Sequence, residues 1–195
     1  MLVISGYCGN LARSIDSIRM SVTPRPLLYD DLDYLGAASG YADEVHEAIS
    51  KGPIFEHFTH REIEALCPFM HCFAASRGVA LLREGDEGDY LLIVLSGKVD
   101  VRKQDPKNKS MSIAVAGPGT SLGEMSLIDG ERRFASCVTT EPTDFAVMTR
   151  FDLNEILVTH PRLANKLLIR LMQIIVCRLR EADDQLLSGC FSPVQ

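Results

Sequence analysis

The stretch SLGEMSLIDGERRFAS, residues 121–136, decides how the chain is interpreted. Gly123 and Glu124 stand before a short apolar run, and Arg133 follows the glutamate by nine positions. This pattern predicts a loop, then a short helix from Glu124 through Ile128, then a return into a strand. A glycine lets the backbone approach a ligand closely, and the unpaired N–H groups at a helix start attract an anion. The stretch is therefore a candidate anion site.

Glu124 and Arg133 indicate what else a ligand here would carry. The Arg133 guanidinium offers paired, charge-assisted hydrogen bonds to an anion. The Glu124 carboxylate repels a phosphate, but it accepts hydrogen bonds from hydroxyl groups such as those of a ribose. A ligand with both a phosphate and a sugar hydroxyl satisfies both side chains. The alternative is a surface salt bridge between Glu124 and Arg133. This stretch alone supports the ligand site and the salt bridge equally.

The sequence around the stretch, from about residue 79 to residue 150, predicts many short strands. Its apolar or alternating runs are separated by glycine and proline turns: Gly85, Gly88, Gly97, the Gly-Pro-Gly at residues 117–119, and Glu141-Pro142. Short strands at regular spacing with turns between them are typical of an all-β barrel or jelly roll.

Helical patterns flank these predicted strands on both sides. Residues 41–50 predict a short helix, and Thr59 with Glu62 forms a capping-box pattern for the next one. After the strands, Asp152 and Glu155 indicate a capping-box-like start for another helix.

A long helix is predicted from Pro161 to about Leu187, because its pattern continues without a breaker. Its apolar residues form a stripe wider than one buried seam needs. We expect one side to face the barrel and the other to face a second chain, and the alternative is that all of it packs on its own barrel. The stripe comprises Leu163, Leu167, Leu168, Leu171, Ile174, Ile175, Leu179 and Leu186.

These patterns divide the chain into three parts. Residues 1–50 are expected to be an extension that is partly helical or flexible, with TPRPLL at residues 23–28 as an extended linker. Residues 51–150 are expected to form the β-rich part with its leading helix. Residues 151–195 are expected to form hinge or lid helices and a dimerisation helix.

Composition excludes several classes of protein. A chain of 195 residues with 46% hydrophobic residues is sufficient for one core. The net charge of -6 argues against a protein that coats nucleic acid. No apolar run is long enough to span a bilayer, and the first residues do not form a secretory signal. We therefore expect a cytoplasmic protein.

Neither the cysteines nor the histidines indicate a metal or catalytic centre. The cysteines are scattered, which suggests reduced thiols: Cys8, Cys67, Cys72, Cys137, Cys177 and Cys190. CPFMHC, residues 67–72, lacks a second cluster at ligand spacing, so we expect no metal. The histidines all lie outside the predicted strands: His46, His57, His60, His71 and His160. No nucleophile arrangement is evident, and we expect no enzyme activity.

The sequence resembles the cyclic nucleotide-binding domain family, which includes the bacterial catabolite activator protein and the regulatory subunits of protein kinase A. LREGDEGDYLLIVLSGKVDV, residues 82–101, is similar to the family's paired strands, and GPGTSLGEMSLIDGERRFAS, residues 117–136, is similar to its phosphate-binding cassette. The resemblance runs from about Ile54 to Leu187. It implies an α+β fold: an eight-stranded antiparallel jelly-roll β-barrel, flanked by N-terminal helices and followed by a hinge helix and a long helix.

The resemblance also assigns roles to residues of the cassette. It implies that Glu124 binds the ribose 2′-OH, that Arg133 binds the cyclic phosphate, and that the backbone of Ala135 flanks that phosphate. Arg132 is expected to be exposed, although it could compete for the anion. The residues expected to bind ligand are Gly123, Glu124, Met125, Ser126, Leu127, Arg132, Arg133, Phe134 and Ala135.

Two positions depart from the family's pattern. Leu122 replaces the usual aromatic before Gly-Glu, which is a mild change. Phe134 stands where alanine, serine or threonine is common. Three alternatives are open for this large side chain: it stacks on a base, it turns into the core, or it partly blocks the pocket. The choice between adenine and guanine therefore does not follow from the usual hydroxyl rule.

The resemblance implies a stand-alone receptor for cAMP or cGMP that signals to a protein partner through its C-terminal helices. The alternative is a degenerate fold that binds no ligand and acts as a dimeric interaction module, and a cyclic dinucleotide also stays open as ligand. Only LSGCFSPVQ follows Leu186, so no DNA-binding domain is expected.

Overall fold

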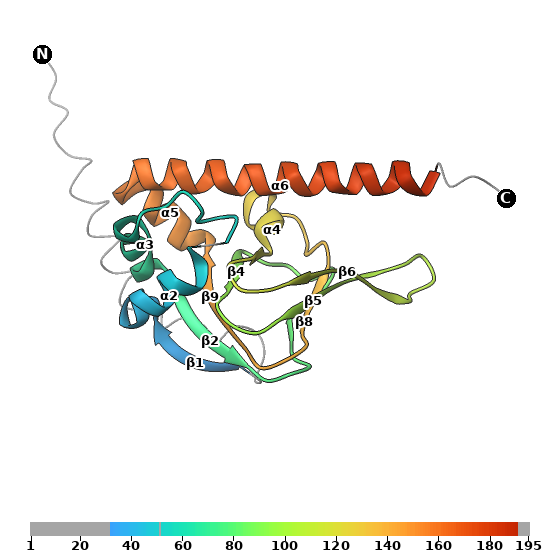
Figure 1. The fold of residues 1–195 in the computed structure, drawn as a ribbon, viewed down its shortest axis with the longest axis horizontal. Coiled ribbons are helices and arrows are strands. Elements are labelled where there is room, and N and C mark those ends of the chain that lie inside the picture. The colour runs from blue at the N-terminus through green and yellow to red at the C-terminus, as the bar shows by residue number, and fades with distance from the viewer. Residues whose placement is uncertain (1–31, 51, 191–195) are drawn as a thin grey trace, which may run out of the picture. The chain divides into compact units, whose positions relative to one another are not determined.

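The computed structural model of the chain describes residues 32–50 and 52–190, with the side chains of residues 185–190 outside that description. All of these residues belong to the unit formed by Asp31–Gln195. The predicted linker at residues 23–28 and the side chain of Leu186 lie outside the described residues. Figure 1 shows strands and short helices on one side of a long C-terminal helix.

The strands form two antiparallel sheets. The five-stranded sheet has the order β1 (Leu32–Ala37), β2 (His71–Ala75), β9 (Thr143–Thr149), β4 (Tyr90–Val94) and β7 (Ser121–Leu122). The four-stranded sheet has the order β3 (Ala80–Leu82), β8 (Ser136–Thr139), β5 (Val99–Gln104) and β6 (Ser110–Ala116).

The expectation of one closed eight-stranded barrel needs correction. The described residues form nine strands, because β1 pairs with β2 and adds an edge to the first sheet. The two sheets share no hydrogen-bonded strand, so they do not close into one barrel. The α+β class and the antiparallel pairing agree with the prediction. His71 was also expected outside the strands, but it is the first residue of β2. Its ring Nδ1 lies 3.0 Å from the Tyr34 hydroxyl oxygen, within hydrogen-bond distance.

The helices match the predicted pattern closely. They are α2 (Ala42–Ile49), α3 (His60–Leu66), α4 (Glu124–Asp129), α5 (Arg150–Thr159) and α6 (Pro161–Cys190), with the short 3-10 turns η1 (Ala38–Tyr41) and η2 (Cys67–Phe69). Thr59 and Glu62 form the predicted capping box of α3. The capping box of α5 is formed by Thr149 and Asp152 rather than by Asp152 and Glu155, so that helix begins three residues earlier than predicted.

The strand β4 shows that the five-stranded sheet is covered on both faces. All five of its residues are buried, so both of its faces are covered. Leu91 and Ile93 belong to the core that the helices share, whereas the Tyr90 hydroxyl on the other face donates to the Leu81 carbonyl of β3. The five-stranded sheet therefore lies between the helices and the four-stranded sheet, in line with the apolar run YLLIV.

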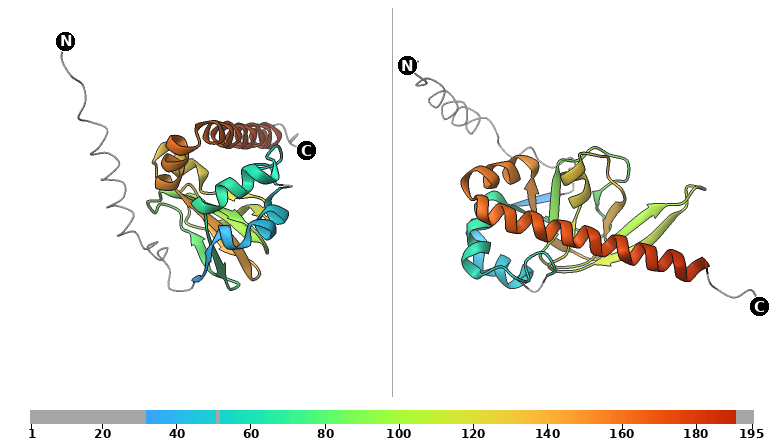
Figure 2. Two further views of the ribbon diagram at one scale, coloured as in Figure 1. Left: turned by 90° about the vertical axis from the view of Figure 1, so that its left-hand side faces the viewer. Right: turned by 90° about the horizontal axis from the view of Figure 1, so that it is seen from above.

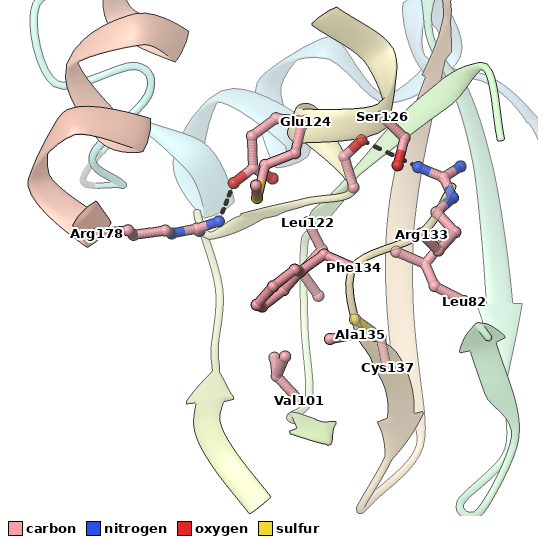
Figure 3. Close-up of a pocket in the computed structure, with 12 residues that line it drawn as sticks. Leu82, Val101, Leu122, Glu124, Ser126, Arg133, Phe134, Ala135, Cys137 and Arg178 are labelled. Atoms are coloured by element: carbon pink, nitrogen blue, oxygen red, sulfur yellow. Dashed lines mark hydrogen bonds and ion pairs between the residues drawn. The ribbon is translucent and has the colours of Figure 1, made fainter. Parts of the chain in front are cut away.

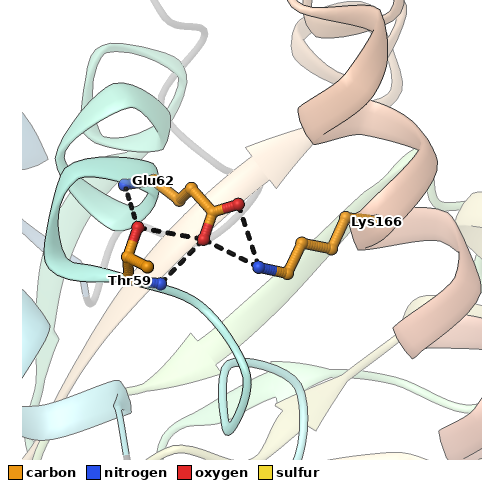
Figure 4. Close-up of polar contacts among 3 residues, drawn as sticks. All are labelled: Thr59, Glu62 and Lys166. Carbon is orange, nitrogen blue, oxygen red and sulfur yellow. Dashed lines mark hydrogen bonds and ion pairs between the residues drawn. The ribbon is translucent and has the colours of Figure 1, made fainter.

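The first half of α6 packs firmly on its own chain (Figures 1 and 2). Its buried residues are Leu163, Ala164, Leu167, Leu171 and Ile174. The Lys166 ammonium also lies 2.9 and 2.7 Å from the two Glu62 carboxylate oxygens (Figure 4). Arg170 reaches the Pro53 carbonyl and the Glu56 carboxylate. Within the part of the chain described, no helix combines the length and apolar character needed to cross a membrane.

Candidate functional site

The site is built on the loop that joins β7 to α4. Gly123 precedes the helix with φ +81°, and Gly130 follows it with φ +78°. Both angles lie in the left-handed region, which favours glycine. A side chain at Gly123 would also meet the guanidinium of Arg133, because a Cβ there would lie 2.6 Å from Nη1. Glycine is therefore required here by conformation and by space.

A pocket opens between this loop and α6 (Figure 3). Its empty volume is about 400 Å³, a figure that includes open solvent at its mouth. Most of its lining is apolar, and the charged groups are one carboxylate and two guanidinium groups. The lining residues are Leu82, Val101, Leu122, Gly123, Glu124, Met125, Ser126, Arg133, Phe134, Ala135, Cys137 and Arg178.

Arg133 is almost completely buried, with 4% of its surface exposed. Its guanidinium carbon lies 4.3 Å from the centroid of the Tyr90 ring, and its Nη1 donates to the Gly123 carbonyl at 3.0 Å. A Cβ at Gly88 would lie 2.1 Å from the Arg133 Nε, so the glycine makes room for the guanidinium. Nη2 is buried without a hydrogen-bond partner. The guanidinium therefore has a donor left unused.

Glu124 is buried as well, with 1% of its surface exposed. Its Oε1 accepts from Nη1 of Arg178 on α6, and Nη2 of the same arginine donates to the Ser121 carbonyl at 2.8 Å. Burial lowers the pKa of the Arg178 guanidinium, and Glu181 partly offsets this. Oε2 of Glu124 is buried and accepts no hydrogen bond. Glu124 and Arg133 thus pair with different partners, unlike the surface salt bridge weighed as an alternative.

The other residues predicted for the site separate into three groups. Met125, Ser126 and Ala135 line the pocket with Gly123. Leu127 instead points into the core that the helices share. Arg132 is exposed, as expected, and its Nη1 donates to the Gly85 carbonyl at 2.7 Å.

Phe134 lines the pocket and does not turn into the core. Its side chain is 53% exposed, and Figure 3 shows it extending into the space between Val101, Leu122 and Arg178. The Lys103 ammonium lies 4.0 Å from the ring centroid. Of the three alternatives for this side chain, the structure removes the one that places it in the core.

Burial raises the pKa of three described cysteine thiols. Burial raises the pKa of Cys137, which lines the pocket, to about 12. Burial likewise raises the pKa of Cys67 and of Cys72 to about 11. These three and Cys177 are unpaired thiols, whereas Cys8 and the side chain of Cys190 lie outside the description. No group of histidine, cysteine or carboxylate side chains suited to a metal is present within residues 32–50 and 52–184.

Sequence reasoning missed Arg178, Gly88 and Tyr90. Arg178 continues the core-facing line of Leu171 and Ile174 at helical spacing. A charged residue on such a line needs a partner in the interior, and that signal was available in the sequence. The roles of Gly88 and Tyr90 depend on contacts with Arg133 across the fold, for which no local pattern exists.

Comparisons with known proteins agree with this geometry. Residues 74–160 match the family model of the cyclic nucleotide-binding domain. The crystal structure of a cyclic nucleotide-binding domain from Methylobacillus flagellatus KT is 45% identical, with a TM-score of 0.75, over 86% of this chain and 94% of that one.

Two curated relatives are similar over part of their length. The cyclic AMP receptor protein of Thermus thermophilus is 31% identical over 134 residues, 69% of this chain and 60% of that protein. The cAMP-dependent protein kinase regulatory subunit of Yarrowia lipolytica is 29% identical over 140 residues, 66% of this chain and 36% of that protein. The chain thus spans less than two thirds of either relative. By sequence and by structure, it belongs to the cyclic nucleotide-binding domain family.

Proposed function

We propose that the chain is a receptor for a cyclic nucleoside monophosphate, cAMP or cGMP. One observation carries the proposal: the same loop holds a buried acceptor without a donor, Glu124 Oε2, and a buried donor without an acceptor, Arg133 Nη2. Unsatisfied polar groups of this kind are uncommon in folded proteins and call for an explanation such as a missing ligand. A sugar hydroxyl satisfies the acceptor, and a phosphate oxygen satisfies the donor. A cyclic nucleotide carries both groups within one ring system.

In this proposal each charged residue has a separate task. Glu124 accepts a hydrogen bond from the ribose hydroxyl through Oε2 while Arg178 keeps Oε1. Arg133 exchanges its contact with the Gly123 carbonyl for the cyclic phosphate, because a charge-assisted bond to an anion is stronger than one to a neutral carbonyl. The apolar lining excludes water around both contacts, which strengthens them.

The same loop is connected to both C-terminal helices. Nη2 of Arg150, the first residue of α5, donates to the Ser126 carbonyl at 2.7 Å. Arg178 of α6 holds Glu124 and Ser121. A ligand that moves the loop therefore acts on both helices, provided that it binds the two arrangements with different affinity. We propose that residues 151–195 carry this change to a protein partner, and that the receptor acts in the cytoplasm, where its thiols stay reduced.

We also propose that two chains pair through α6. Its exposed apolar residues repeat at three and four positions, the spacing of a helix–helix seam: Ile169, Met172, Val176 and Leu179. Val176→Glu places a charge in that seam and is expected to shift sedimentation from dimer to monomer. Val158→Glu is the matched control, since Val158 is an exposed valine on α5 away from the seam. Equal sedimentation of the wild type and Val176→Glu would contradict the pairing.

Two adjacent arginines provide the test of ligand binding. Calorimetric titration of the chain with cAMP and with cGMP is expected to show binding that Arg133→Ala weakens by about 100-fold, since a charged hydrogen-bonded contact is lost. Arg132→Ala is expected to leave the affinity unchanged, because Arg132 lies outside the pocket. A titration with cyclic di-GMP determines whether a larger ligand is preferred. Unchanged affinity in Arg133→Ala would refute the proposal.

A further inference from the structure

We infer that Phe134 is the surface on which the base of the ligand stacks, so that the pocket selects purine over pyrimidine cyclic nucleotides. This inference rests on the proposed function and adds to it the residue that recognises the base. Glu124 and Arg133 account for the ribose and the phosphate, which every cyclic nucleotide has in common. Selection among bases must come from other groups in the pocket.

Phe134 is the one aromatic residue among those that line the pocket. The helix that passes over the site, residues 161–190, contains no aromatic residue. A nucleobase presents a flat π face, and stacking on an aromatic ring is worth about 1–3 kcal/mol per base. Within the described pocket, therefore, Phe134 alone provides an aromatic face for a base.

The ring is held in place from one side only. The Lys103 ammonium sits over the ring, donates to the Phe134 carbonyl and lies 2.9 Å from the Glu84 carboxylate. Glu84 in turn accepts from the Gln104 backbone N–H at 2.9 Å. Lys103 does not line the pocket, so it covers the ring without filling the cavity. A side chain fixed by a cation, an ion pair and a strand presents a preorganised surface.

The ring also borders the apolar part of the pocket. Figure 3 shows the ring extending into the space between Val101, Leu122 and Arg178, and Val101 and Leu122 form an apolar side of the pocket. The polar contacts of the site are on α4 and Arg133, away from that apolar side. A nucleotide held there by its ribose and phosphate has its base directed into the remaining space. A purine, with two fused rings, covers more of the phenylalanine than a pyrimidine does.

The test compares cAMP with cCMP in three variants by calorimetric titration. Phe134→Ala and Phe134→Leu are expected to weaken cAMP binding by about tenfold or more, and to weaken cCMP binding less. Leucine keeps the apolar volume and loses the π face, so it separates stacking from simple filling of the cavity. Phe151→Ala is the matched control, because Phe151 is 54% exposed on α5, outside the pocket. It is expected to bind both ligands as the wild type does.

A spectroscopic readout follows from the absence of tryptophan in the sequence. Phe134→Trp introduces one reporter, whose emission is expected to be quenched by cAMP and less by cCMP as the base stacks. Phe151→Trp is expected to show no change with either ligand.

The outcomes separate the two claims. If Phe134→Ala binds cAMP as tightly as the wild type or more tightly, while Arg133→Ala still binds it weakly, the stacking inference is wrong. The proposed receptor function is then retained. If the folded wild type and all variants bind no cyclic nucleotide, the proposed function fails and the stacking surface fails with it. If only Phe134→Ala binds, the ring blocks the pocket, and the inference is overturned.

Discussion

The two halves of α6 contact the rest of the chain in different ways. Up to Ile174, the helix buries a line of apolar residues against the core. Lys166 adds an ion pair to Glu62 of α3, and Arg170 adds one to Glu56 in the turn before α3. Beyond Ile174, Arg178 is the described residue that joins the helix to the binding loop. The first half is therefore held by packing, whereas the second half is held through the loop that forms the pocket. If the pocket binds a ligand as proposed, the second half of α6 is the half that the ligand reaches through Arg178.

The largest effect is expected from breaking the packing of the first half. Leu171→Ala removes a fully buried side chain and leaves a cavity, so we expect it to lower the free energy of unfolding by about 2–5 kcal/mol. Denaturant unfolding measures the difference. Asn165→Ala, an exposed position on the same half, is the control and is expected to change it by less than about 0.5 kcal/mol. Similar losses in both variants would mean that this half is not held by packing.

A smaller effect is expected from Arg178→Ala in the second half. Glu124 then keeps its buried charge without a partner, which costs about 3–5 kcal/mol for a fully buried pair. Because 41% of the Arg178 side chain is exposed, we expect about 1–3 kcal/mol here.

A double-mutant cycle sharpens this prediction. Glu124→Gln removes the charge, so it is expected to recover part of the stability lost in Arg178→Ala. Strict additivity of the two losses would show that these side chains do not interact.

The smallest effect is expected from the ion pair of Lys166 with Glu62. A hydrogen bond from Lys166, together with one from the Thr59 backbone, holds the pKa of Glu62 below its usual value. A carboxyl with a lowered pKa stabilises the fold above its unfolded-state pKa, and this contribution disappears as the pH falls through the folded-state pKa. Both side chains are partly exposed, so Lys166→Ala is expected to cost about 0.5 kcal/mol at pH 7.

The pH dependence distinguishes this pair from a packing effect. Unfolding of the wild type and of Lys166→Ala, measured from pH 7 down to the acid limit of the fold, is expected to converge as Glu62 becomes protonated. A difference that stays constant over this range would assign the loss to the contact of the Lys166 ammonium with the Phe58 ring, 4.6 Å from its centroid, instead.

Several elements are predictable from the sequence because their signals are local. The capping box at Thr59, the start of α6 at Pro161 and the glycine before Glu124 each depend on a few neighbouring residues. The prediction for the start of α5 is off by three residues because Asp152 fits two patterns. It can be the N-cap residue followed by Glu155, or the acidic residue three positions after the N-cap Thr149, and the structure has the second.

The site was predictable only in part. The order of Gly123, Glu124 and Arg133 along the loop indicated a ligand, but their partners depend on contacts across the fold. Tyr90 and Arg178 are 43 and 54 residues away from the side chains they contact, Arg133 and Glu124 respectively. The addition of β1 to the sheet also depends on its pairing with the distant strand β2. The spacing of apolar residues along the sequence does not predict which strands pair.

Hydrogen exchange of the α6 backbone, with and without saturating cAMP or cGMP, tests the central claim most directly. We expect the nucleotide to change exchange in residues 176–190 and to leave residues 161–174 as they are, because Arg178 is the described α6 residue that bonds the proposed binding loop. In Arg178→Ala the change in residues 176–190 is expected to be lost. Exchange that the nucleotide leaves unaltered, or alters equally along the whole helix, would contradict the account.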